Sequence, residues 1–243
     1  MKRLLPVLLF LSCHATEGAS FEPLPEKSDG DEMLELSTMD KEDFVFTFLL
    51  TAPDDPELSA EEMKTAMAGH FSNMRKLGEE RVLLFAGPLG EPRSQPDHRG
   101  IFVLNTPNVA DGEVMAATDP AIQAGVFAIE CYPFRSATDL RRIPELIEEQ
   151  RDEQEDAEKP PANIRAYVMV TTKALDESAL DRIGLLDVVV MTGMFGGTME
   201  GTACMIVAAE TVDEARELLG SRSVATDALT FHPLWGTDVL VQL

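Results

Sequence analysis

The feature that most constrains the fold of this 243-residue chain is a pattern that occurs twice in the sequence. The run VLLFAGPLGE parallels VVVMTGMFGG, the stretch GIFVLNTPNVADGEVMAA parallels ACMIVAAETVDEARELL, and ECYPF parallels TFHPLW. The two copies lie about a hundred residues apart, a spacing that indicates an internal repeat. The repeat predicts two units of similar architecture within one chain.

In the first unit, residues 43–134, strand-like and helix-like segments follow one another in the order β-α-β-β-α-β. The first helix is marked by Ser59 and, three residues later, by Glu62, which together form a capping-box pattern. The expected strands are DFVFTFLLT, RVLLFAGPLG, RGIFVLN and VFAIECYPF. This order of elements is that of the ferredoxin-like fold.

The second unit, residues 164–243, repeats this order with a shorter first helix. A single ferredoxin-like sheet carries helices on one face only, and its other, apolar face must be buried. Two units in one chain can bury these faces against each other. The sequence therefore predicts an α+β protein in which two ferredoxin-like (βαββαβ) units pack sheet to sheet as a pseudo-dimeric α+β barrel.

Two polar segments flank the first unit. Residues 20–42 are acidic and rich in Pro, Ser and Gly, and we expect a disordered acidic tether there. Residues 135–163 are highly charged, have a helix-like pattern and end in Pro-Pro, which is typical of a charged helical linker or a solvated helix.

The amino-terminal residues 1–19 have the pattern of a signal peptide. Lys2 and Arg3 precede LLPVLLFL, an apolar run that is too short to span a bilayer as a helix. The pattern predicts an exported protein.

The end of the signal has two interpretations, which the sequence leaves open. Residues 9–13 resemble a bacterial lipobox, in which Cys13 would be lipidated and the signal would end at residue 12. Ordinary cleavage near Ala15 or Ala19 is the alternative. The expected location is accordingly the periplasm of a bacterium or its membrane surface, where the lipid would be the only membrane contact.

The acidic composition argues against a nucleic-acid-binding function. Hydrophobic residues make up 44% of the chain, so it can build a core, but its formal net charge of −23 repels nucleic acids. The sequence contains no glycine-rich phosphate loop, no Ser-His-Asp motif and no metal-ligand spacing, so we expect neither a cofactor nor a metal. Cys131 and Cys204 lie in apolar runs, where two separate thiols are favoured over a disulfide.

Several stretches of the first unit together resemble a YCII-related domain. The stretches that carry the resemblance are AGHFSNMRKL, LLFAGPLG, GIFVLN, AATDPAIQAGVF and IECYPF. This family belongs to the dimeric α+β-barrel group, which includes muconolactone-isomerase-like proteins. The resemblance covers residues 43–134 well and 164–235 weakly. It implies that His70 and Asp119 form a catalytic pair.

The pattern around His70 agrees with part of this implication. His70 is the polar member of an otherwise apolar helix face that also carries Met63, Met67, Met74 and Leu77. A buried histidine needs a hydrogen-bond partner, and Asp119 is the candidate that the resemblance supplies. Two interpretations stay open: an acid/base pair, or a core histidine beside an Asp119 that only caps the helix starting at Pro120.

Four further residues are candidates for contact with a ligand. Gly87 and Pro88 end a strand, where a missing Cβ leaves room for a ligand or for a tight turn. Arg99, in a polar loop, could bind an acidic group at the mouth of a cleft, and Gly125 follows the Asp-Pro segment. The second unit has no histidine at the position equivalent to His70, so we expect it to have a structural role and no catalytic residues.

These observations lead to two hypotheses for the function. The first is cofactor-free acid/base chemistry, of the isomerase or lyase type, on a small organic molecule in a cleft between the sheet and the first helix. The alternative is a non-catalytic ligand-binding or assembly module tethered at the cell surface. Whether the chain also forms homo-oligomers is open.

Overall fold

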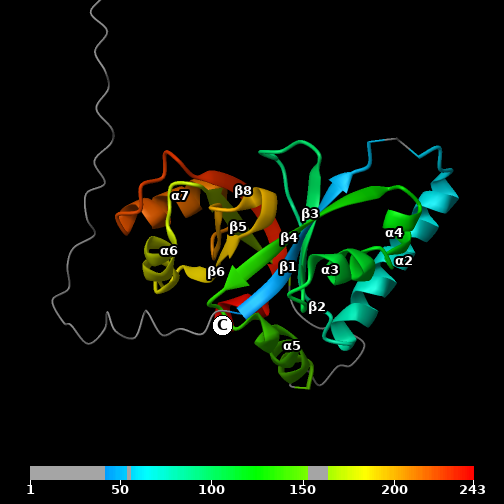
Figure 1. The fold of residues 1–243 in the computed structure, drawn as a ribbon, viewed down its shortest axis with the longest axis horizontal. Coiled ribbons are helices and arrows are strands. Elements are labelled where there is room, and N and C mark those ends of the chain that lie inside the picture. The colour runs from blue at the N-terminus through cyan, green and yellow to red at the C-terminus, as the bar shows by residue number, and fades with distance from the viewer. Residues whose placement is uncertain (1–41, 54–55, 153–163) are drawn as a thin grey trace, which may run out of the picture.

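The computed structural model describes residues 42–53, 56–152 and 164–243, which form an α+β fold around one antiparallel eight-stranded sheet (Figure 1). The strands are β1 (Glu42–Thr51), β2 (Leu83–Pro88), β3 (His98–Leu104), β4 (Phe127–Ser136), β5 (Ile164–Thr172), β6 (Val189–Phe195), β7 (Ala203–Val207) and β8 (Thr230–Thr237). The helices are α2 (Ala60–Glu79), α3 (Val109–Ala116), α4 (Pro120–Gln123), α5 (Ile143–Asp152), α6 (Glu177–Gly184) and α7 (Val212–Ser221). Short 3₁₀ helices span Leu140–Arg142 (η1), Gly197–Met199 (η2) and Asp238–Gln242 (η3).

The sheet is nearly closed into a barrel. Its strand order is β2-β3-β1-β4-β6-β7-β5-β8, so that the strands of the two halves of the chain form two contiguous sets of four. The sets join where Phe134 on β4 pairs with Phe195 on β6, and again at a bridge between Leu89 and Leu234 beside β2 and β8. The expectation of a barrel-like α+β fold is confirmed. The halves are joined edge to edge in a single sheet, which leaves few strand edges unpaired.

The two seams between the halves have matching contacts. The backbone N–H of Gly90 donates to the carbonyl of Pro233 at 2.8 Å, and that of Gly196 donates to the carbonyl of Pro133 at 2.8 Å. A Cβ atom on Gly87 would lie 2.1 Å from the carbonyl oxygen of Trp235. The space beside Gly87 is therefore filled by the last strand of the other half, which explains this glycine by strand packing rather than by contact with a ligand.

Alternation along β1 separates an inner core from an outer one. Phe44, Phe46 and Phe48 belong to the cluster inside the barrel, while Val45 and Leu49 pack outside it. Inside, the ring of Phe46 lies 5.2 Å from that of Phe134 and 5.0 Å from that of Phe195. Aromatic residues from both halves thus fill the barrel, and the space for a site is left on its outer face or at its ends.

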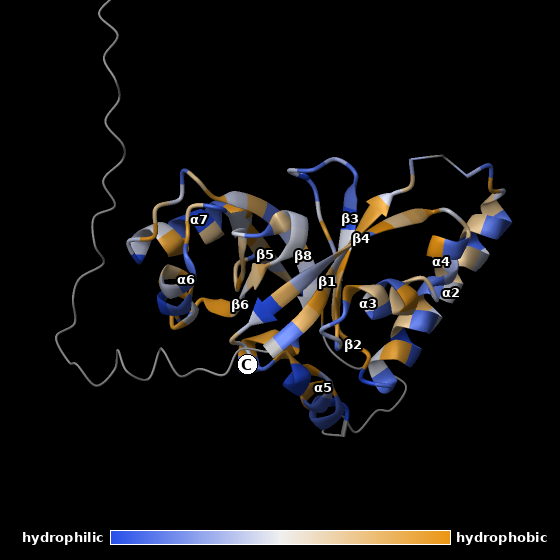
Figure 2. Ribbon diagram, viewed as in Figure 1, coloured by the Kyte–Doolittle hydropathy of each residue, from blue (hydrophilic) through white to orange (hydrophobic). Residues whose placement is uncertain are grey.

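The helices cover the outside of the barrel. Figure 1 shows α2, α3 and α4 beside the strands of the first half, and α6 and α7 beside those of the second. Figure 2 shows hydrophobic residues concentrated in the strands and hydrophilic residues along the outer turns of the helices. The capping box expected at the start of α2 is formed, because Ser59 and Glu62 each accept from the backbone N–H of the other.

The segment expected to be a charged linker contains the helix α5, which packs against the barrel. Leu140, Ile143 and Leu146 are buried in the barrel cluster, and Figure 1 shows α5 at one end of the barrel. Its charged face remains outside, where Glu145 and Glu148 both pair with Arg81. Residues 140–147 are therefore part of the fold and not a helix solvated on all sides, since their apolar residues close an open end of the inner core.

Several sequence-based expectations concern residues outside the described ranges. The signal peptide at 1–19, the lipid on Cys13, the tether up to residue 41 and the end of the linker, 153–163, lie there. Within the described ranges, no helix combines the length and the apolar character that a membrane crossing requires. Cys131 and Cys204, which are both described, carry free thiols, as expected.

Candidate active site

His70 lies in the middle of α2 and faces the sheet. Its ring stacks on Phe102 of β3 at a centroid separation of 6.1 Å and an interplanar angle of 19°, and it lies 5.5 Å from the ring of Phe127 on β4. Only 8% of its side chain is exposed. The helix position that the periodicity assigned to His70 is therefore a buried one, and the ring needs a polar partner.

Asp119 is that partner, and it caps α4 as well. Its Oδ1 accepts from the backbone N–H of Ala121 at 2.8 Å, while its Oδ2 lies 2.6 Å from Nδ1 of His70. The carboxylate is fully buried, and Pro120 follows it at the first helical position. The two roles that the sequence left open for Asp119 are therefore compatible, because its two oxygens serve different partners.

The hydrogen bond to Asp119 determines which nitrogen of His70 is available. An ionised carboxylate only accepts hydrogen bonds, so Nδ1 carries the donated proton, and in the neutral ring Nε2 keeps a lone pair. Nε2 forms no hydrogen bond with the residues that the structure describes. The side chain as a whole keeps 8% of its surface exposed. The arrangement presents a basic nitrogen whose ring is held by a carboxylate.

Gly69 brings the two members of the pair together, a role that sequence analysis missed. A Cβ atom on Gly69 would lie 2.7 Å from the Cβ of Pro120, so α2 and α4 approach each other across this glycine. Glycine in a helix interior costs about 1 kcal/mol relative to alanine. An isolated glycine beside a histidine in a helical pattern is the signal that could have indicated this close contact.

A cleft of about 600 Å³ lies near the pair, with neither His70 nor Asp119 among its described lining residues. Phe127, which contacts the His70 ring, lines it together with Met63, two helical turns before His70 on the same face of α2. Its other described lining residues are Thr51, Ala52, Pro53, Pro56, Arg99 and Val126. The cleft thus lies between the first helix and the sheet, where the sequence-based hypothesis expects one.

The four candidate ligand residues lie in two places. Arg99 lines the cleft, and its Nε donates to Oγ1 of Thr51 at 2.5 Å. Gly125 has a positive φ of 73° and ends α4 just before the lining residue Val126. Gly87 and Pro88 lie at the seam between the halves and do not line this cleft. The structure therefore brings Arg99, but not Gly87 or Pro88, to the cleft beside His70.

Polar side chains gather inside one end of the barrel, a second feature that the sequence did not reveal. His232 is buried, with Nδ1 2.5 Å from the hydroxyl of Ser94 and Nε2 3.0 Å from that of Thr171. The ring of His98 packs on that of Phe48 at 4.6 Å, and its Nδ1 is buried without a partner. Burial lowers the pKa of His232 to about 4, with a smaller contribution from His98.

This depressed pKa predicts a loss of stability in acid. A histidine in the unfolded chain has a pKa near 6.5. Between pH 6.5 and about 4, the unfolded chain is therefore protonated at this histidine while folded His232 is still neutral. His232 should contribute fully to stability above pH 6.5, and about 3 kcal/mol should be lost by pH 4. Urea unfolding of the wild type and of His232→Gln across this range measures the difference. Carboxylates titrate alike in both proteins, so parallel pH profiles would contradict the assignment.

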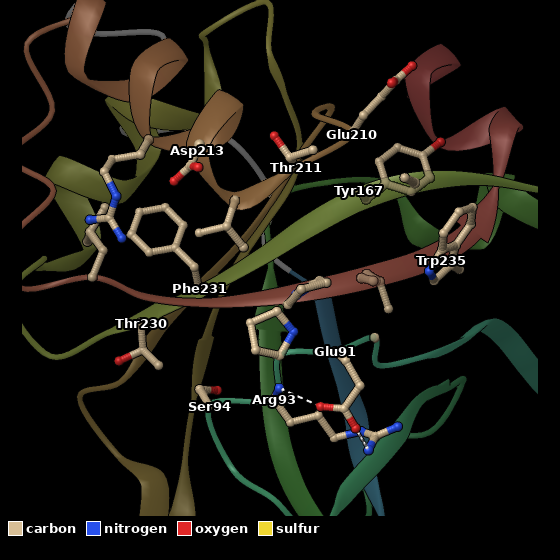
Figure 3. Close-up of a pocket in the computed structure, with 18 residues that line it drawn as sticks. Glu91, Arg93, Ser94, Tyr167, Glu210, Thr211, Asp213, Thr230, Phe231 and Trp235 are labelled. Carbon is tan, nitrogen blue, oxygen red and sulfur yellow. Dashed lines mark hydrogen bonds and ion pairs between the residues drawn. The ribbon is translucent and has the colours of Figure 1, made fainter.

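A second hollow, of about 760 Å³, is lined by residues of both halves of the chain, including Glu91 and Arg93 of the first and Tyr167 and Trp235 of the second (Figure 3). Figure 3 shows Thr211 and Asp213 on one side of β8 and Glu91 and Arg93 on the other. Trp235, with 47% of its surface exposed, lines one end. None of the candidate residues derived from the sequence lines this hollow.

The described residues contain no group of three or more His, Cys, Asp or Glu side chains arranged to hold a metal ion. The chemistry that the site offers on its own residues is therefore hydrogen bonding and proton transfer at His70, beside the charge of Arg99.

Neither the comparison with protein-family models nor that with curated proteins finds a match for this chain.

Proposed function

We propose that this protein catalyses proton transfer on a small organic molecule, as a cofactor-free isomerase or lyase, with His70 as the acid/base group. The observation that carries the proposal is the 2.6 Å hydrogen bond between the buried Asp119 carboxylate and Nδ1 of His70. It orients the ring and leaves Nε2 without a described partner. The ring lies 5.5 Å from that of Phe127, which lines the cleft.

In this mechanism Nε2 removes a proton from the bound molecule and becomes an N–H group. The positive charge that forms on the ring is stabilised by the Asp119 carboxylate, which remains ionised. Return of the proton from Nε2 to a different atom of the molecule completes an isomerisation. In an elimination of the lyase type, the electron pair left by the proton expels a leaving group, and Nε2 then passes the proton to that group. Oriented donors and acceptors of this kind typically accelerate proton transfer by roughly 10²–10⁴-fold.

The proposal extends to the ancestry of the fold. Each half of the chain is assigned as a ferredoxin-like unit, and the whole as a tandem YCII-related protein whose second copy has lost its site. The equal strand order of the two halves and the matching glycines at the seams support this. The short α6, which has no histidine, supports the loss of chemistry in the second half. The signal-like amino terminus supports export.

Carbethoxylation by diethyl pyrocarbonate tests the state of His70, because the reagent attacks a ring nitrogen that has a free lone pair. Peptide mapping by mass spectrometry should find His70 modified at Nε2 near neutral pH. His232, whose two nitrogens are both hydrogen bonded, should remain unmodified and serves as the internal reference. Asp119→Asn should slow the reaction of His70 at least tenfold, since an amide can donate to Nδ1 and move the proton to Nε2.

The same experiment can contradict the proposal. A His70 that is as unreactive as His232 in the folded protein would identify it as a core histidine. Equal rates in the wild type and in Asp119→Asn would remove the orienting role of the carboxylate. Circular dichroism of both proteins is the control that the fold is intact.

The alternative function, a non-catalytic binding module, is favoured by the 760 Å³ hollow, which both halves line. That hollow exposes Trp235, and neither His70 nor Asp119 lines it. It predicts ligand binding that quenches Trp235 fluorescence and is unchanged by His70→Gln. The chain contains a single tryptophan, so the signal reports on this hollow directly.

A further inference from the structure

We infer that the substrate of the His70 site is a small organic monocarboxylate, and that Arg99 binds its carboxylate group. The inference names the substrate class of the function proposed above and rests on it.

The cleft has apolar walls and one positive charge. Apart from Arg99 and Thr51, its described lining residues are Ala, Pro, Met, Val and Phe. A guanidinium among apolar walls is costly to desolvate unless an anion accompanies it. The described lining, which holds one cation, is complementary to a molecule with an apolar body and a single negative group.

Arg99 has no acidic partner among the described residues, in contrast to three other arginines. Arg81, Arg135 and Arg222 each pair with a carboxylate within 3.1 Å. Arg99 forms no ion pair with any residue in the described part of the chain. Arg165, Arg182 and Arg216 likewise form no ion pair within the described ranges, and Arg99 differs from them in lining the cleft near His70. The anion that pairs with Arg99 is the group that a substrate would bring.

The guanidinium of Arg99 is held in place by one of its three nitrogens. Its Nε donates to Oγ1 of Thr51, and this hydroxyl donates in turn to the carbonyl of Asp97 at 3.4 Å. The two terminal nitrogens are left to bind both oxygens of a carboxylate, the planar pairing that arginine favours. A guanidinium oriented in advance loses less conformational entropy when the ligand binds.

The distance along β3 fits one small molecule. Phe102, on which the His70 ring stacks, follows Arg99 by three residues of the strand. At the usual rise per residue, the backbone positions of Arg99 and Phe102 are roughly 10 Å apart. The long side chain of Arg99 lines the cleft and can reduce the gap between its guanidinium and the region of Phe102. A carboxylate bound at Arg99 therefore leaves the apolar part of the same molecule near the His70 ring, where proton transfer would take place.

Binding of benzoate, with neutral benzamide as its matched control, tests the inference. Titrations followed by NMR should show benzoate shifting the signals of Val126 and Phe127, with benzamide at least tenfold weaker. Arg99→Gln should weaken benzoate binding at least tenfold, because it removes a charge-assisted pair of hydrogen bonds. Arg135→Gln, which removes an exposed arginine at the other end of β4, should leave the affinity unchanged. Equal binding of benzoate and benzamide, or wild-type affinity in Arg99→Gln, would overturn the inference.

Protection of His70 separates this inference from the function on which it rests. Saturating benzoate should slow the carbethoxylation of His70 in the wild type and not in Arg99→Gln. A reactive His70 that benzoate does not protect would overturn the inference and keep the acid/base function. Benzoate bound at Arg99 beside an unreactive His70 would support the anion site and overturn the catalytic function.

Discussion

Replacing Asp119 with alanine is expected to lower the free energy of unfolding by roughly 3 kcal/mol. The substitution leaves the buried Nδ1 of His70 without its partner, which costs about 1–3 kcal/mol. It also removes the N-cap of α4, which costs about 1 kcal/mol more. Both losses occur in a fully buried environment, where water does not replace the missing acceptor. Urea unfolding at neutral pH measures the change.

Asp176→Ala is the matched control for this prediction. Asp176 is also an N-cap, accepting from the backbone N–H of Ala179 at 2.8 Å, but it is exposed and forms no buried pair. Its replacement should therefore cost only about 1 kcal/mol. Asp119→Asn, which can keep the cap, should fall between the two alanine variants. If Asp119→Ala were no more destabilising than Asp176→Ala, the His70–Asp119 hydrogen bond would not be holding α2 to α4.

Replacing Gly87 with alanine should destabilise the protein by about 3 kcal/mol, the upper end of the usual cost of overpacking. The new methyl group would lie 2.1 Å from the carbonyl oxygen of Trp235, a backbone atom that cannot move without opening the seam between β2 and β8. The seam also carries the hydrogen bond from Gly90 to Pro233, which would be strained by the same movement. Thermal and urea unfolding both measure this decrease in the free energy of unfolding.

Gly220→Ala is the control for the seam. A Cβ atom on Gly220 meets no atom within 4 Å, and Gly220 lies in α7, so alanine should raise the stability there by up to about 1 kcal/mol. A Gly193→Ala variant, at the opposite seam, should resemble Gly87→Ala, since its Cβ would lie 2.2 Å from the Phe134 ring. A neutral effect of Gly87→Ala would instead indicate open space at this glycine, as the ligand-binding hypothesis for Gly87 requires.

Short-range patterns in the sequence were reliable guides to this protein. The capping box at Ser59 and Glu62 begins α2, and the apolar run DFVFTFLLT forms β1. The Asp-Pro pair in AATDPAIQAGVF begins α4. These features depend on hydrogen bonds and side-chain directions within a few residues, so each is visible in a short stretch of sequence.

The pairing of His70 with Asp119 was anticipated, but not from the residues alone. The helix face of His70 indicated a need for a partner, and the resemblance supplied Asp119. Gly69 was missed because its role depends on Pro120, which a different helix brings to it. The charged stretch after β4 was misjudged in one respect, since its few apolar residues, Leu140, Ile143 and Leu146, close the end of the barrel.

The sequence by itself determined the order of the elements, the caps of the helices and the buried face of α2, because these follow from local periodicity and local hydrogen bonds. Only the tertiary structure decided what lies beside Gly87, which residues close the barrel and that Arg99 faces the same cleft as Phe127. Gly87 and Trp235 are far apart in the sequence, and their contact depends on how two sheet edges join. No local pattern encodes such a contact, because it is a property of the packed chain and not of either segment.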